Sequence, residues 1–181
     1  MTLLRSKTSR IRMLALLVMA GATLSACSPT PEPSPTPTAA FASEEEAFAA
    51  AEEVYRAYND AYNQIDFADP STFTQLDDFT AGTYQAEERE GLSQMHADGV
   101  IRTGNAAVVW FRGIEFSADS TVHARVCKDI SGVAIKDADG NSLVSPDRSD
   151  FSAVDLTFET VASEVVLVDS EAVVDETCLP S

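Results

Sequence analysis

Residues 43–66, SEEEAFAAAEEVYRAYNDAYNQID, decide how this chain folds. Ser43 and Glu46 form a capping box, in which the serine accepts a hydrogen bond from a first-turn amide and the glutamate reaches back. The glutamates of that first turn suit the positive end of a helix. Apolar side chains then recur every three or four residues, so we predict one helix that runs to about residue 66. The members of this apolar stripe are Phe48, Ala51, Val54, Tyr55, Tyr58, Tyr62 and Ile65.

Two more helices are predicted after the first. Asp69 and Pro70 are the types expected at the N-cap and the first position of a short helix, which would carry Phe73, Leu76 and Phe79. A third helix is predicted over residues 83–97, and Gly99 is well placed to end it. Its expected inward side chains are Tyr84, Leu92 and Met95, and its expected outward ones are Glu87, Glu88 and Glu90.

The pattern changes from helical to alternating after Gly99, which predicts strands. Residues 105–117 place Ala107, Val109 and Phe111 on one face, with a bulge expected at Gly113. Residues 121–129 place Val122, Ala124 and Val126 on one face and His123, Arg125 and Cys127 on the other. Further strands are expected at 133–137, at 142–145, around Val154, Leu156 and Phe158, and at 164–174. The predicted class is α+β, with N-terminal helices packed on a strongly curved antiparallel sheet.

The N-terminal segment has the parts of an export signal. Basic residues precede the apolar stretch 13–22, which is about half the roughly 20 residues that a membrane-crossing helix needs. Leu24-Ser25-Ala26-Cys27 resembles the lipobox of bacterial lipoproteins, in which the cysteine receives a diacylglyceryl group before cleavage. That resemblance implies lipidation of Cys27 and a lipid anchor on the extracytoplasmic face of the cytoplasmic membrane. The alternative is an ordinary signal peptide that is cleaved at another small residue.

The predicted organisation has three parts: a lipoprotein signal peptide at 1–26, the lipidated cysteine with a proline-rich linker at 27–42, and a single α+β domain at 43–181. The alternating prolines of the linker favour an extended conformation. The chain has 29 acidic and 12 basic residues and a formal net charge of −17, which argues against a nucleic-acid partner.

Two cysteines remain once Cys27 is assigned to lipid. In an exported chain, Cys127 and Cys178 suggest one disulfide, and a free buried thiol is the alternative. Neither has a histidine or a further cysteine at zinc-ligand spacing, so no metal site is predicted there. Asp137, Asp139 and Asn141 resemble part of a calcium loop, but Pro146 stands where the bidentate glutamate would be, so a hairpin turn is predicted instead. Nothing in the sequence predicts a cofactor.

Several stretches carry a family resemblance: residues 53–58 (EVYRAY), 99–104, 126–132 (VCKDISG) and 137–140 (DADG), together with Cys178. They resemble the nuclear transport factor two-like (SnoaL-like) superfamily of cone-shaped, cystatin-like domains. More narrowly, they resemble the small lipoproteins of Gram-positive bacteria that carry such a domain behind a proline- or threonine-rich linker. The resemblance implies a helix seated in the concave face of the sheet and, in enzymes of this fold, an acid or a histidine inside the cone. Domains of this fold often pair through their sheets, so a homodimer is one option.

Two functions are therefore considered. The first is a non-catalytic binding module on the outer membrane face, whose partner is a protein, a wall component or a small ligand, because no nucleophile with its base is visible. The second is a cone-pocket isomerase, dehydratase or hydrolase acting on a small apolar substrate. Its candidate pocket residues are Tyr58, Tyr62, His123 and Arg125, with His123 as the general acid or base if it points into the cone.

Overall fold

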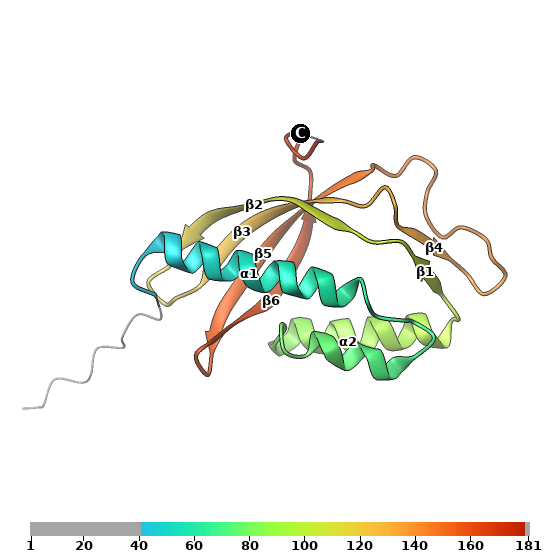
Figure 1. Ribbon diagram of the computed structural model, residues 1–181, viewed down its shortest axis with the longest axis horizontal. Coiled ribbons are helices and arrows are strands. Elements are labelled where there is room, and N and C mark those ends of the chain that lie inside the picture. Colours follow the sequence, from blue (N-terminus) through green and yellow to red (C-terminus); the bar gives the residue numbers. More distant parts are fainter. Residues whose placement is uncertain (1–40, 180–181) are drawn as a thin grey trace, which may run out of the picture. The chain divides into compact units, whose positions relative to one another are not determined.

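The computed structural model of this chain describes residues 41–179, in which helices come first and strands second (Figure 1). The helical elements are α1 (Glu44–Tyr62), the 3-10 helix η1 (Pro70–Leu76) and α2 (Gly82–Ala97). The strands are β1 (Ile101–Thr103), β2 (Ala107–Phe116), β3 (Val122–Asp129), β4 (Ala134–Lys136), β5 (Phe151–Val161) and β6 (Glu164–Val173). The predicted signal peptide, Cys27 and nearly all of the linker lie outside the described residues.

Helix α1 begins as the sequence predicts. The Ser43 hydroxyl accepts from the Glu46 amide at 3.2 Å, and the Glu46 carboxylate accepts from the Ala42 amide at 2.9 Å. The helix ends at Tyr62, about one turn earlier than predicted, because Asn63 turns the chain and binds the backbone of Ala106. That turn lets Ile65 and Phe67, which are 7% and 4% exposed, enter the core from outside the helix.

The next two helices also follow their capping residues. The Asp69 carboxylate accepts from the Ser71 amide at 3.0 Å and Pro70 opens η1, which is a 3-10 helix rather than an α-helix. Helix α2 ends just before Gly99, whose φ of +66° lies in the left-handed region that glycine adopts without strain.

Four strands form the main sheet in the order β2-β3-β5-β6, and every neighbouring pair is antiparallel. Helices α1 and α2 lie on the same side of this sheet (Figure 1). The predicted α+β class, with helices on one face of a curved antiparallel sheet, is confirmed.

The region after β3 departs from the predicted hairpin. Strand β4 pairs with β1 in a separate two-stranded sheet, and residues 142–145 form no strand apart from one isolated bridge between Lys136 and Ser142. The Ser142 hydroxyl accepts from the Val144 amide at 3.2 Å, and this local bond competes with a ladder. The turn itself is present, because one carboxylate oxygen of Asp137 accepts from the amides of Asp139 and Asn141.

The prediction that Val109 and Phe111 share one face of the strand is wrong. Register shifts between Val108 and Trp110 and between Gly113 and Glu115 show that β2 contains two bulges, not only the predicted one. The first bulge turns Val109 away from the helices, so that Val108 and Phe111 contact the main core while Val109 and Trp110 pack on the opposite face of the sheet.

The main core lies between the helices and the sheet, and a smaller cluster on the opposite face surrounds Cys127 and Cys178. No helix within residues 41–179 has the length and hydropathy needed to cross a membrane. The buried members of the main core are Ala47, Ala51, Tyr55, Tyr58, Ala61, Ile65, Phe67, Phe73, Leu76, Leu92, Val122, Ala124, Val126, Val154, Leu156, Phe158 and Leu167.

Gly104, between β1 and β2, tests how closely the chain must approach the segment that precedes β4. Its φ is +77°, and a Cβ there would lie 1.9 Å from the Gly132 carbonyl oxygen. Gly140 is the matched control, because its φ is +88° and its Cβ would contact nothing within 4 Å. Both alanine variants carry the penalty of about 1–2 kcal/mol for a left-handed residue, and Gly104→Ala adds about 1–3 kcal/mol of overpacking. Urea unfolding should show this difference; equal losses would contradict the close approach.

Candidate functional site

A cavity of about 430 Å³ lies between the C-terminal half of α1, helix α2, the small β1–β4 sheet and the nearby end of β3. Aromatic and aliphatic side chains make most of its wall, and a few charged groups converge on it. Its lining residues are Tyr55, Tyr58, Asn59, Tyr62, Phe67, Tyr84, Glu88, Gly91, Leu92, Met95, Arg102, Ala106, Lys128, Ile130, Val133, Ile135 and Arg148. Of the predicted pocket residues, Tyr58 and Tyr62 lie here.

One wall of the cavity carries a carboxylate among tyrosines. The Tyr58 hydroxyl donates to Glu88 Oε1 at 2.5 Å and lies 3.1 Å from the Tyr84 hydroxyl, and the Thr80 hydroxyl lies 3.5 Å from Glu88 Oε2. Burial raises the pKa of Glu88 above its usual range, although the bonds from Tyr58 and Thr80 act in the opposite direction. Burial likewise raises the pKa values of Tyr58 and Tyr84, so these hydroxyls stay protonated at neutral pH.

The prediction that Glu88 faces outward is wrong. Glu88 is four residues after Tyr84 and four before Leu92, which places all three on the same face of α2. Tyr58 of α1 supplies a hydrogen bond to the carboxylate on that face, which makes the partly buried acid tolerable. The i, i+4 spacing to Tyr84 and Leu92 indicates an inward Glu88, although glutamates on a helix usually face solvent.

A second wall carries cations. Arg102 of β1 donates to Asn63 Oδ1 at 3.0 Å and lies over the Tyr62 ring, with 5.4 Å from its guanidinium carbon to the ring centroid. Arg148 donates through one terminal nitrogen to the carbonyls of Ile130 and Val133 at 2.9 and 3.0 Å. Lys128 extends the inward alternation of β3 and is half-buried beside Arg102. Burial lowers the pKa of Lys128, and the charge of Arg102 lowers it further.

His123 and Arg125 do not line this cavity. They lie on the opposite side of β3 from Val122 and Val126, which are buried under the helices, so the alternation of the strand excludes them from the cone. The His123 ring nitrogen Nδ1 lies 3.2 Å from the Thr157 hydroxyl of β5. The role of His123 as an acid or base beside Tyr58 or Tyr62 is therefore excluded by position.

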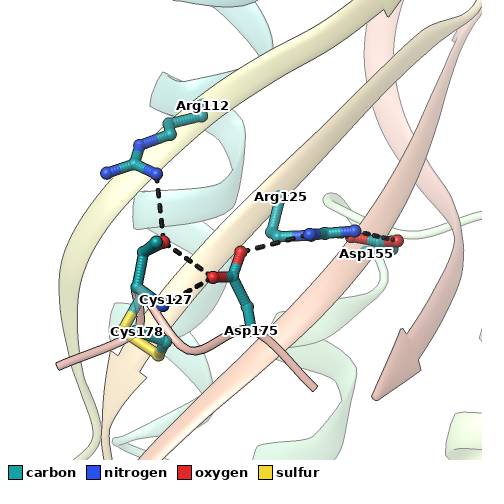
Figure 2. A network of polar contacts seen from close by, with 7 residues as sticks. Arg112, Arg125, Cys127, Asp155, Asp175 and Cys178 are labelled. Carbon is teal, nitrogen blue, oxygen red and sulfur yellow. Dashed lines mark hydrogen bonds and ion pairs between the residues drawn. A yellow bond between two sulfur atoms is a disulfide. The ribbon is translucent and has the colours of Figure 1, made fainter. Parts of the chain in front are cut away.

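Arg125 belongs to an ion-pair network on that opposite face (Figure 2). Its guanidinium contacts both oxygens of Asp155, at 2.5 and 2.9 Å, and one oxygen of Asp175 at 3.1 Å. Hydrogen bonds from Thr177, together with Arg125, lower the pKa of Asp175 to about 2. The arrangement joins β3, β5 and the segment after β6.

The same segment is held by the predicted disulfide. The Sγ atoms of Cys127 and Cys178 are 2.04 Å apart, so the expected pairing is confirmed and the free-thiol alternative is excluded. Thr177, the residue before Cys178, accepts a hydrogen bond from Arg112 (Figure 2). The guanidinium carbon of Arg112 lies 4.0 Å from the centroid of the Trp110 ring. This face has an ordered polar network, but its charged groups bind one another.

Within residues 41–179 no group of three or more histidine, cysteine, aspartate and glutamate side chains is placed to hold a metal ion. The expected turn at Asp137 uses its carboxylate for backbone amides and for the Asn141 side chain at 2.9 Å. Among the described residues, the cavity is therefore the place where charged groups and apolar side chains face one common space.

Comparisons with known proteins show the fold alone. No family model matches this chain, and no curated protein matches it by sequence. The intermembrane space region of the chloroplast protein ARC6 is similar, with a TM-score of 0.54, 10% identity, and coverage of 71% of this chain and 97% of that one. Weaker likenesses include a "putative aromatic ring hydroxylase" from Novosphingobium aromaticivorans (TM-score 0.48, 12% identity, 72% and 96% coverage). Aln2 from a Streptomyces species is another (TM-score 0.42, 17% identity, 72% and 90% coverage). These last two have folds of the nuclear transport factor two-like type.

Sequence reasoning missed the charged residues that line the cavity. Lys128 had a signal, because it follows Val126 by two residues and so shares its face of β3. For Glu88, the helical spacing described above indicates a position facing the cavity. No local pattern indicates such a position for Arg102 or Arg148, because the pairing of β1 with β4 and a loop bring them to the cavity.

Replacement of Glu88 by glutamine tests the buried carboxyl. Because the pKa of Glu88 is raised by folding, ionisation costs stability as pH rises from about its unfolded value near 4.3 through the folded value. Glutamine cannot ionise but still accepts from Tyr58. We expect Glu88→Gln and wild type to have similar urea midpoints near pH 4, and the variant to become the more stable one by about pH 8.

Glu87→Gln, at the exposed neighbouring position of α2, controls for the loss of one negative charge. Its stability relative to wild type should not show the rise with pH that Glu88→Gln shows. A Glu88→Gln curve parallel to that of wild type across this pH range would contradict the raised pKa.

Proposed function

We propose that this protein is a lipid-anchored extracytoplasmic lipoprotein whose domain binds a small ligand in the cone cavity without transforming it. The observation that carries the proposal is the cavity of about 430 Å³ between α1, α2 and the strands. Its volume falls in the range of about 300–1,000 Å³ that is usual for small-molecule sites. A cone filled by its own side chains would have favoured a protein partner on the outer sheet face instead.

The composition of the wall also supports ligand binding. Tyr55, Tyr62, Leu92, Met95 and Ile135 offer apolar surface, which gains free energy when a ligand displaces water. Charged groups converge on the same space from α2, β1, β3 and a loop, and such groups fix the orientation of a ligand. A shaped apolar site with a few polar groups is what a selective small-molecule receptor requires.

Anchoring at the membrane is supported by residues 1–42. The basic start, the short apolar stretch and the Leu24–Cys27 motif together fit a lipoprotein signal, and the prolines that follow fit an extended spacer. Two or three acyl chains on Cys27 would hold the protein stably, since one chain alone binds a membrane only reversibly. The ligand would then be captured on the outer side of the cytoplasmic membrane.

The cone-pocket enzyme is the second candidate, and Glu88 is the observation that favours it. A carboxyl group with a raised pKa, hydrogen-bonded to Tyr58 and facing a cavity, has the properties of a general acid or base. Catalysis would require that a bound ligand be converted and that Glu88→Gln abolish conversion while ligand still binds. Binding without conversion by wild type supports the non-catalytic module.

Gly91 allows the cavity to be filled without disturbing the fold. It lines the cavity from α2, and a Cβ there would contact nothing within 4 Å. We expect Gly91→Leu to weaken binding of 1-naphthamide, a neutral aromatic probe, by about tenfold or more, because the new side chain occupies the ligand volume. Thermal stability should be kept or increased, since glycine costs a helix about 0.5–1 kcal/mol relative to alanine.

Ala86→Leu is the matched control, because it adds the same kind of side chain to an exposed position of the same helix. Ligand-observed NMR titrations of the full chain and of both variants measure the affinities. Equal affinities in wild type and Gly91→Leu would place the probe outside the cavity and would contradict the proposal.

Cys27→Ala tests the anchor. In a bacterium that processes lipoproteins, we expect the wild type to enter the membrane fraction and to incorporate an alkyne-labelled fatty acid. Cys27→Ala should lose both properties, because its side chain has no thiol to acylate, whereas Ser28→Ala should keep them. Mass spectrometry of the N-terminal peptide identifies the acylated residue. Membrane association that persists in Cys27→Ala would overturn the lipoprotein assignment.

A further inference from the structure

Three basic side chains on the cavity wall lack an acidic partner. Within residues 41–179 no carboxylate oxygen lies within 4.0 Å of a side-chain nitrogen of Arg102, Lys128 or Arg148. Among the described residues, Arg102 and Arg148 donate only to an amide oxygen and to backbone carbonyls, and each through one terminal nitrogen. Lys128 has no hydrogen-bond partner in the same part of the chain. Several charged donors are therefore free to meet a ligand.

A shortage of acids does not explain this arrangement. The chain has 29 acidic residues against 12 basic ones, and three of the four other arginines within residues 41–179 are paired with acids, while Arg112 contacts Thr177 and the Trp110 ring. Arg56 contacts Glu52, Arg89 contacts Asp77, and Arg125 contacts two aspartates. Of the five cations within residues 41–179 that have no carboxylate partner, three therefore line the cavity, while Arg112 binds Thr177 and Lys136 is exposed to solvent.

The free-energy cost of burying a cation without a carboxylate partner is largest at Lys128. Removing an ammonium group from water is unfavourable unless it is paired or hydrogen-bonded. Burial lowers the pKa of Lys128, and the nearby Arg102 adds like-charge repulsion in the same direction. An anion placed between these side chains would relieve both effects, because charge-assisted hydrogen bonds are stronger where water is excluded.

We infer that the cavity takes a small organic anion, with its acid group held by Arg102, Lys128 and Arg148 and its apolar body packed among the tyrosines. The inference rests on the proposed binding function and names the chemical class of its ligand. The tyrosine and leucine surfaces require an apolar body, which an inorganic ion does not have. A polyanion such as nucleic acid is disfavoured by the net charge of −17.

The opposite wall gives the ligand a direction. The Glu88 carboxylate accepts a hydrogen bond from Tyr58 and is not within salt-bridge distance of any of the three cations. The acid group of the ligand is attracted by the three cations, and it is repelled by the side chain of Glu88 when Glu88 is ionised. The anionic end of the ligand therefore lies against β1, β3 and the Arg148 loop, and its apolar end points towards α2.

A matched pair of probes tests the inference on the full chain. 1-Naphthoate and 1-naphthamide have nearly the same shape and differ in charge. We expect calorimetric titration to show naphthoate binding about tenfold or more tightly than naphthamide, the effect of one charged hydrogen-bonded pair. Lys128→Met should remove most of this preference, weakening naphthoate binding far more than naphthamide binding, because methionine keeps the length of the side chain and loses its charge.

Lys136→Met is the control. Lys136 is exposed on β4 and does not line the cavity, so this variant has the same change in net charge and should keep the naphthoate preference. Inorganic phosphate should compete only at far higher concentration, because it lacks an apolar body.

The outcomes separate the two proposals. Equal affinities of the two probes, with Gly91→Leu weakening both, would overturn the anionic ligand and leave small-molecule binding intact. An equal loss of both probes in Lys128→Met, or competition by phosphate at naphthoate concentrations, would also overturn the inference. Failure of both probes to bind wild type would overturn the binding function and the ligand class together.

Discussion

The packing of α1 against the concave face of the sheet sets the shape of everything around it. In its N-terminal half the buried residues are Ala47 and Ala51, both fully shielded, so the helix approaches the strands closely. A Cβ on Gly113 of β2 would lie 2.3 Å from the Phe48 ring, which shows how little space remains there. In the C-terminal half, Tyr55 and Tyr58 replace the alanines, and the cavity opens beside them. One helix thus both closes the core and frames the site.

Strand β3 divides the chemistry of the domain into two faces. Its inward side chains Val122, Ala124 and Val126 complete the core, and Lys128 continues the same alternation into the cavity. Its outward face carries Arg125, which pairs with Asp155 and Asp175, and Cys127, which joins Cys178 (Figure 2). The outward charges are satisfied within the chain, whereas Lys128 is not. The inward face of β3 therefore offers a charged group to a ligand, whereas the outward face stabilises the fold.

The disulfide and the ion pairs together fasten the end of the described chain to the sheet. A cross-link that closes a loop of 51 residues stabilises the fold by about 4 kcal/mol in the chain-entropy model. The segment it holds covers a second, smaller core formed with Val109 and Trp110. The apolar residues from Val108 to Phe111, which lie on both faces of β2, thereby pack within one chain, and a homodimer through the sheet stays a prediction. The cavity needs a stable frame, and this face helps to supply it.

The sequence by itself determined the helix starts, the four strands of the main sheet, the cysteine pair and the α+β class, because capping bonds, periodicity and residue type act over a few positions. The tertiary structure alone decided the bulge at Val109 and the pairing of β1 with β4, and it supplied Tyr58 as the hydrogen-bond partner of Glu88. It also decided that Tyr58 and Tyr62 share a cavity with Arg102, Lys128 and Arg148 while His123 faces away. Those features depend on contacts between residues far apart in the sequence, such as the 30 positions between Tyr58 and Glu88. At such separations the partner across the cavity, and not the local pattern, fixes which way a side chain points.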